Sequence, residues 1–134
     1  MVNNDYHVIK STADVKELQA VSNGLHDGYI LHVEYCNNGI SACNHHLSFD
    51  YSKKALRLHI LVTSLPEHPT FEIFFQNILE WQVNEYQFSN MIGFSVLFLD
   101  NGMIMWADGI SSNMDDLKSG SYVIADTIQY RQLS

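Results

Sequence analysis

The sequence is poor in positive charge, cysteine and proline, and each shortage excludes a class of protein. Seven Lys and Arg stand against fifteen Asp and Glu, which gives a net charge of −8 that repels nucleic-acid phosphates and anionic membrane surfaces. Cys36 and Cys43 form no Cys-x-x-Cys pair, so we expect two reduced thiols and no disulfide framework. Two prolines and 12% aromatic residues are typical of an ordered chain.

Long apolar segments are missing as well. No window approaches the roughly 18 apolar residues that a membrane-spanning helix needs. Residues 1–10 lack the basic and apolar regions of a signal peptide, so we expect a cytoplasmic protein. The chain has 134 residues, of which 46% are hydrophobic, and this suits one compact domain over residues 1–134. Charged residues make up only 16%, so we expect some exposed apolar area and a partner to cover it.

One segment near the N-terminus has the signals of a helix. Ser11 offers a cap, Asp14 lies three residues further on, and Val15 and Leu18 share one face with Val21 or Ser22. The pair at positions 23–24, Asn-Gly, ends the helix because a left-handed residue is easily adopted there.

Beyond residue 28 the hydrophobic period is mostly two, which predicts strands. Residues 29–36 and 54–62 alternate clearly and predict half-buried strands, whereas residues 41–50 predict a weaker strand. Residues 70–83 predict two strands, or one bent strand with a bulge near Asn77. Asn101-Gly102 predicts a type I′ turn within a hairpin over residues 91–108, and residues 109–120 predict a polar loop. Residues 121–133 close the chain as a strand with Tyr122, Ile124, Ile128 and Tyr130 on one side.

One helix followed by seven or eight strands predicts an α+β fold, mainly antiparallel β. Short connections favour a curled sheet or a barrel-like two-layer form, with the N-terminal helix covering one open end or face.

No motif in the sequence carries a recognisable catalytic chemistry. There is no Gly-x-Ser-x-Gly elbow, no glycine-rich phosphate loop, and neither cysteine precedes a predicted helix. Seven histidines invite a metal hypothesis, and the nearest group is Cys36, Cys43, His45 and His46 with His32 and His59 on adjacent predicted strands. Their spacing fits no closed structural site, so we expect no catalytic residue, no metal and no cofactor.

The region before the last strand is acidic and has an aromatic residue within it. Asp100, Asp108, Asp115 and Asp116 surround Trp106, and no Lys or Arg lies between positions 100 and 116. Such a loop can bind a basic protein, with the tryptophan as an anchor and the carboxylates as steering charge. The alternative is a solvated loop with a buried tryptophan.

His26 and Asp27 are adjacent, at the point where helical periodicity ends and strand periodicity begins. Neighbouring side chains diverge, so the pair is a poor base and orienting carboxylate. Asp27 suits a turn and His26 can donate to a nearby carbonyl, so we interpret them mainly as corner residues that could also join a binding surface.

Three short segments, "LHDGYILHVEY", "MIMWADG" and "SYVIADTIQYRQL", together resemble a loose group of small bacterial proteins. These have a Leu/Phe-His-Asp turn and a closing Tyr-x-x-Ala-x-x-Ile-x-Tyr-Arg strand. The matching positions are Leu25, His26, Asp27, Trp106, Asp108, Tyr122, Ala125, Ile128, Tyr130 and Arg131. Similar small acidic proteins accompany toxins as immunity partners, so the resemblance implies a protein-binding role.

The leading hypothesis is a non-enzymatic protein-binding module, of immunity or accessory type, for a basic partner protein. Its expected contact residues are Trp106, Asp108, Asp115, Asp116, His26 and Asp27. The alternative is a β-barrel, enzymatic or not, that binds a small ligand or metal in a lumen lined by His32, His59, Tyr29 and Tyr35. A homodimer that pairs exposed sheet edges is a further hypothesis, and neither nucleic acid nor membrane is expected as a partner.

Overall fold

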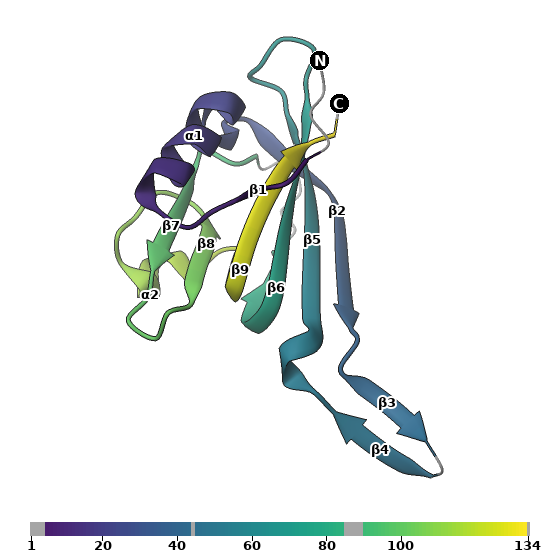
Figure 1. Ribbon diagram of the computed structural model, residues 1–134. Helices are drawn as coiled ribbons and strands as arrows, with labels where there is room; N and C mark the ends of the chain where they lie inside the picture. The colour runs from purple at the N-terminus through teal and green to yellow at the C-terminus, as the bar shows by residue number, and fades with distance from the viewer. Residues whose placement is uncertain (1–4, 44, 85–89, 134) are drawn as a thin grey trace.

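The computed structural model describes residues 5–43, 45–84 and 90–133, which form one antiparallel sheet, a separate hairpin and an N-terminal helix (Figure 1). In chain order the elements are β1 His7–Val8, α1 Thr12–Ser22, the 3-10 turn η1 Asn23–Leu25, β2 Gly28–Asn37, β3 Ile40–Cys43, β4 His46–Phe49, the 3-10 turn η2 Tyr51–Lys53, β5 Lys54–Val62, β6 Thr70–Gln82, β7 Phe94–Phe98, β8 Ile104–Asp108, the one-turn helix α2 Met114–Leu117 and β9 Tyr122–Gln132.

The seven-stranded sheet has the strand order β2-β5-β6-β9-β8-β7, and β1 also pairs with β9. All of these pairings are antiparallel, so the predicted α+β, mainly antiparallel class is confirmed. The predicted curled or barrel-like form is wrong. The strands β2 and β7 end the order and do not pair with each other in the described part of the chain, whereas a barrel needs such a closing pair.

Helix α1 forms where the sequence predicts it. The Asp14 carboxylate accepts from the backbone N–H groups of Lys10 at 2.9 Å and Ser11 at 3.0 Å, which satisfies two donors at the helix start. Asn23 ends the helix in the left-handed region at φ 52°. Leu18 is fully buried, so this helix is held to the sheet by its apolar face.

The core has two parts, one on each face of the sheet. The larger part packs Leu18 and Leu25 against side chains of β5, β6, β8 and β9, and the smaller part includes Leu117 of α2. Tyr122 and Ile124 belong to the smaller part, while Ile128 and Tyr130 belong to the larger one. The prediction that these four residues share one side is therefore wrong.

The side chains of β9 change from one face of the sheet to the other beside an irregularity in β6. Asn77 has a φ of 55°, and the β6–β9 register shifts between Ile78 and Glu80. The prediction of one bent strand with a bulge near Asn77 is confirmed, because β6 runs unbroken past this point.

The hairpin of β7 and β8 is confirmed, but its predicted turn type is wrong. A type I′ turn needs positive φ at both central residues, and of Asn101 and Gly102 only Gly102 has it, at 83°. The N–H of Gly102 donates to the carbonyl of Leu99 at 3.1 Å, which centres the turn on Asp100 and Asn101. Gly102 then supplies the left-handed residue that returns the chain to the strand.

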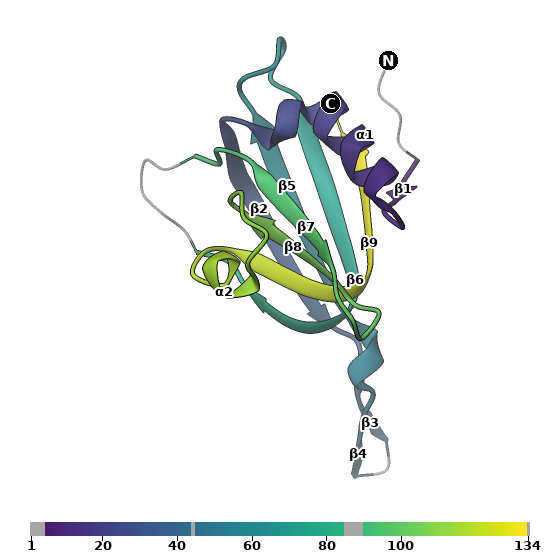
Figure 2. The ribbon, with the colours of Figure 1, turned by 90° about the vertical axis from the view of Figure 1, so that its left-hand side faces the viewer.

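Residues 41–50 were predicted as one strand and instead contribute to a two-stranded hairpin, β3–β4. Both views show this hairpin projecting away from the seven-stranded sheet (Figures 1 and 2). Its base is tight: the Asp50 N–H donates to the Gly39 carbonyl at 2.6 Å. A Cβ on Gly39 would lie 1.7 Å from the Asp50 carbonyl oxygen, so no larger residue fits there without a backbone shift.

Candidate functional site

Trp106 lies in the core and not on the surface where partner binding was expected. Its side chain is 0% exposed, and its ring packs edge-on against Phe75 with ring centres 5.9 Å apart. Both neighbours, Met105 and Ala107, are also fully buried, because β8 is covered on both faces. The fold therefore has the buried tryptophan of the alternative interpretation. A partner cannot reach this indole in the present conformation.

Three carboxylates of the predicted contact group, those of Asp108, Asp115 and Asp116, lie near one another along the chain but have different surroundings. Asp108 ends β8, and burial raises its pKa above the ordinary value. Asp115 and Asp116 are exposed in the single turn of α2, where carboxylates are favoured near the N-terminus. Asn113 accepts from the Asp115 N–H at 2.8 Å and begins that turn. Partner binding by these three carboxylates stays a prediction.

His26 and Asp27 form the corner between η1 and β2. The His26 Nδ1 lies 2.9 Å from the carbonyl oxygen of Ile92, and Asp27 accepts from the Asn90 side-chain amide at 2.5 Å. Asp27 has a φ of 55°, a region that Asp tolerates better than most residues. Both side chains therefore tie the corner to residues 90–92. The Gly109 N–H in turn donates to the Gly93 carbonyl at 3.0 Å. The corner and the start of the acidic loop therefore both contact the segment of residues 90–93.

The outer face of the sheet, opposite α1, holds a polar cluster that the sequence did not predict. We call it the Glu72 cluster, and its members are Tyr6, Glu34, Arg57, His59, Glu72 and Arg131. Glu72 is only 3% exposed and lies near the start of β6. Its carboxylate accepts from the Tyr6 hydroxyl, lies 2.8 Å from His59 Nε2 and accepts from Arg131 Nε at 3.2 Å.

The electrostatics of the cluster keep Glu72 ionised. Burial alone would raise the pKa of Glu72, but hydrogen bonds from Tyr6 and His59 and the charge of Arg131 outweigh burial and lower it. Arg57 Nη1 also donates to Glu34 at 3.1 Å, and its guanidinium lies 4.1 Å from the centre of the Phe74 ring. The cluster thus pairs the carboxylates of Glu34 and Glu72 with two guanidinium groups.

The signal for this cluster lies in the strand register rather than in any motif. His59 pairs with Glu72 across β5 and β6, and Glu72 pairs with Arg131 across β6 and β9. Within "TFEIFF" the only charged side chain is Glu72, and an acid in an apolar strand needs a partner. The partner could not be named before the pairing of strands was known.

His32 lies beside the Glu72 cluster and forms a cross-strand pair with its member His59. They occupy opposite positions on β2 and β5, with ring centres 5.0 Å apart. Their placement on adjacent strands was predicted, but the lumen that they were expected to line with Tyr29 and Tyr35 does not exist, because the sheet is open. Tyr35 instead pairs with the buried Leu56 and contacts Trp81, with ring centres 5.2 Å apart.

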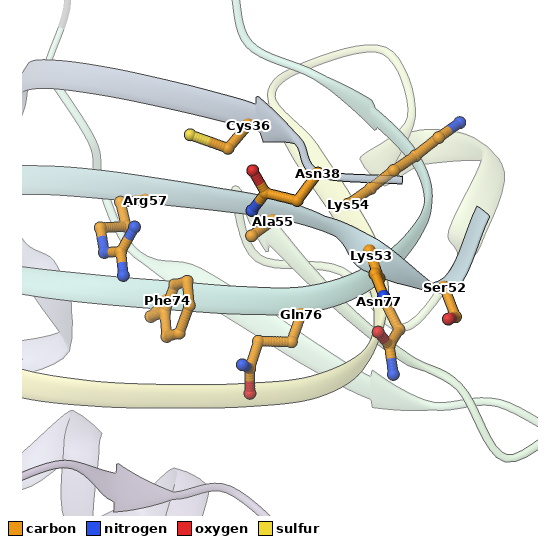
Figure 3. A pocket seen from close by; sticks show the side chains of 10 residues that line it. All are labelled: Cys36, Asn38, Ser52, Lys53, Lys54, Ala55, Arg57, Phe74, Gln76 and Asn77. Carbon is orange, nitrogen blue, oxygen red and sulfur yellow. The ribbon is translucent and has the colours of Figure 1, made fainter. Parts of the chain in front are cut away.

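A hollow of about 320 Å³ lies on the same face, next to Arg57 (Figure 3). Its walls come from β2, β5, β6 and the segments that join them: Cys36, Asn38, Ser52, Lys53, Lys54, Ala55, Arg57, Phe74, Gln76 and Asn77. Lys53 lies 3.7 Å from Asp50, and Arg57 is already paired with Glu34. The positive charge of the hollow is therefore largely offset by nearby carboxylates.

The exposed apolar surface gathers on β2 and on the hairpin β3–β4. Of the fourteen large apolar side chains that are exposed in the described part of the chain, seven lie between residues 29 and 49: Tyr29, Leu31, Val33, Tyr35, Ile40, Leu47 and Phe49. The predicted half-burial of β2 is wrong, since most of its residues are exposed.

The hairpin itself has one apolar face. Ile40 pairs with Phe49 and Ala42 with Leu47, two residues apart on each strand, so these four side chains lie on the same side. Ser41 pairs with Ser48 on the opposite side. We call the face formed by Ile40, Ala42, Leu47 and Phe49 the arm face. Ile40, Leu47 and Phe49 are 52%, 65% and 56% exposed.

Comparisons of the chain with protein-family models, with curated proteins and with solved structures found no match. Within residues 5–43, 45–84 and 90–133, no helix is long and apolar enough to cross a membrane. The same residues contain no group of three or more His, Cys, Asp or Glu side chains placed to hold a metal ion.

Proposed function

We propose that the chain is a non-enzymatic protein-binding module that contacts a basic partner protein through the arm face and the adjoining strand β2. The observation that carries this proposal is the amphipathic hairpin β3–β4, which projects from the sheet with Ile40, Leu47 and Phe49 exposed on one side. A two-stranded hairpin is marginally stable in water by itself. An exposed apolar face on such an element is typical of a surface that a partner covers.

Contact energetics favour the arm face as the central part of an interface. Fully burying a Leu, Ile or Phe side chain contributes about 1.5–3 kcal/mol. Association itself costs about 4–15 kcal/mol, so the arm face would be the apolar centre of a larger interface that also takes in β2. Asp50 is the only Asp, Glu, Lys or Arg between residues 38 and 50, so little charge would have to be desolvated at the contact.

The net charge of −8 supports a basic partner. At a distance a negative protein attracts a positive one, and exposed carboxylates such as Asp115 and Asp116 raise the rate of association more than the final affinity. The resemblance to small bacterial proteins that accompany toxins makes a basic toxin the first partner class to test.

The test uses the purified product of the adjacent gene and titration calorimetry against the full chain. Leu47→Asp/Phe49→Asp should weaken binding at least about a hundredfold, because each change places a charge in an apolar contact. Ser48→Asp places one such charge on the opposite face of β4 and should bind within about threefold of the wild type, whereas Leu47→Asp alone should weaken binding clearly.

Two outcomes would overturn the proposal. One is equal affinity of the Leu47→Asp/Phe49→Asp variant and the wild type for a bound partner. The other is a concentration-dependent dimer in light scattering that dissociates in that variant, which would make a second copy of the chain the occupant of the arm face.

A further inference from the structure

The histidine pair on the outer face of the sheet has the ring separation of two ligands to one metal ion. His32 and His59 lie opposite each other on β2 and β5, with ring centres 5.0 Å apart. Two imidazoles that bind a tetrahedral ion at about 2.0–2.1 Å have ring centres about 5 Å apart, since each centre lies about 3 Å from the ion. The separation of the two rings therefore matches that of a shared ion.

A hydrogen-bond partner orients His59 for metal binding. Its Nε2 lies 2.8 Å from a carboxylate oxygen of the buried Glu72. When Nε2 donates to that oxygen, the lone pair of the ring is on Nδ1, where a metal ion can bind. A carboxylate behind a histidine in this way fixes the ring and makes it a better metal ligand.

His32 supplies the adjustable partner. Its side chain is 51% exposed, and its Nε2 lies 4.0 Å from a Glu34 carboxylate oxygen, so the ring can turn with little loss of packing. The charges around the pair balance, because Glu34 and Glu72 face Arg57 and Arg131. The site thus lacks the net positive charge that would repel a cation.

We propose that His32 and His59 bind one divalent transition-metal ion, with Glu72 as the positioning residue behind His59. Two imidazole nitrogens favour Zn²⁺, Cu²⁺ or Ni²⁺ over Mg²⁺ or Ca²⁺, which prefer oxygen ligands. Water completes the coordination, since no third His, Cys, Asp or Glu joins the pair within the described residues. The site is separate from the arm face and does not depend on protein binding.

The test is calorimetric titration of Zn²⁺ into the full chain without an affinity tag. One ion per chain should bind, and His32→Ala and His59→Ala should each weaken binding by at least about tenfold. Glu72→Gln should weaken it by about 10- to 100-fold while both ligands remain. His68→Ala is the matched control, because His68 is exposed in another turn, and it should bind as the wild type does.

Nitrogen chemical shifts of the imidazoles add a readout that a purely structural role would not move. Zinc should shift the ring nitrogens of His32 and His59 and leave those of His7, His26 and His68 in place. The proposal is wrong if the wild type takes up no zinc at millimolar concentration, or if His32→Ala and His59→Ala bind as tightly as His68→Ala. Circular dichroism of each variant separates loss of the site from loss of the fold.

Discussion

Replacement of Glu72 by Gln should destabilise the fold by about 2 kcal/mol at pH 7. Three donors reach this carboxylate, from Tyr6, His59 and Arg131, and the side chain is only 4% exposed. Hydrogen bonds to an ionised group are about twice as strong as neutral ones, so loss of the charge costs roughly 0.5–1 kcal/mol for each donor. Relief of the cost of burying a charge offsets part of that sum.

Urea unfolding of the wild type and of Glu72→Gln measures this difference. For a chain of this size, about 2 kcal/mol corresponds to a midpoint of thermal unfolding lower by about 4–10 °C. Glu34→Gln is the matched control, because Glu34 is 46% exposed and contacts Arg57 at 3.1 Å and the exposed His32 only at 4.0 Å. An exposed pair contributes at most about 1 kcal/mol, so this control should change stability far less.

The same variant has a defined pH dependence. Because the pKa of Glu72 is lower in the folded chain than its ordinary value of 4.5, the carboxylate stabilises the fold fully above that value. This contribution is lost as the pH falls through the lowered pKa. The free-energy difference between wild type and Glu72→Gln should therefore be constant near neutral pH and shrink in acid. Equal stability at pH 7, or a difference that does not shrink as the pH falls, would refute the account of the cluster.

Three further predictions concern the core, Asp108 and the base of the arm. Leu18→Ala should cost about 2–5 kcal/mol in urea unfolding because Leu18 is fully buried, whereas Val21→Ala, at a position 46% exposed, should stay within about 0.5 kcal/mol of the wild type. Burial raises the pKa of Asp108, so the ionised form of Asp108 opposes folding. Asp108→Asn should therefore raise the free energy of unfolding by about 0.5 kcal/mol at pH 7. This gain in stability should vanish in acid, where Asp108 is protonated in the wild type. Gly39→Ala should displace the hairpin β3–β4, because the added Cβ would meet the Asp50 carbonyl oxygen at 1.7 Å, and amide exchange should then accelerate in residues 40–49 while β5, β6 and β9 remain protected. Unchanged exchange in the hairpin would contradict the last of these.

Most parts of the fold that depend on neighbouring residues were predictable from the sequence, although the type of the turn at Asn101-Gly102 was not. Helix α1 follows from Ser11, Asp14 and Asn23, all of which act within one turn of the helix ends. The bulge in β6 follows from broken alternation near Asn77. These signals are local, so no knowledge of the rest of the chain was needed.

The parts that depend on distant pairing were not predictable. The barrel hypothesis failed because alternation identifies strands but does not show whether the first and last strands of a sheet meet. Trp106 was expected at the surface because aspartates surround it in sequence, yet it packs against Phe75 in the larger core part, while the smaller core part beside α2 covers the other face of β8. The acidic residues of a loop therefore say little about the burial of the strand before it.

In the candidate sites, too, features that depend on distant pairing were the ones that the sequence did not predict. His32 and His59 were expected on adjacent strands, and the register places them opposite each other. Glu72 was not foreseen as a centre, because its partners Tyr6, His59 and Arg131 come from three distant segments. The arm face was missed because residues 41–50 were interpreted as one strand, whereas the hairpin turn brings Ile40 beside Phe49.

Amide hydrogen exchange of the chain with and without a bound partner tests the protein-binding proposal most directly. Binding through the arm face should slow exchange in β3 and β4, where the apolar side chains are exposed, and leave α2 with its free-state rates. Slowed exchange confined to residues 108–117, with β3 and β4 unchanged, would contradict the proposal and return the contact surface to the acidic loop.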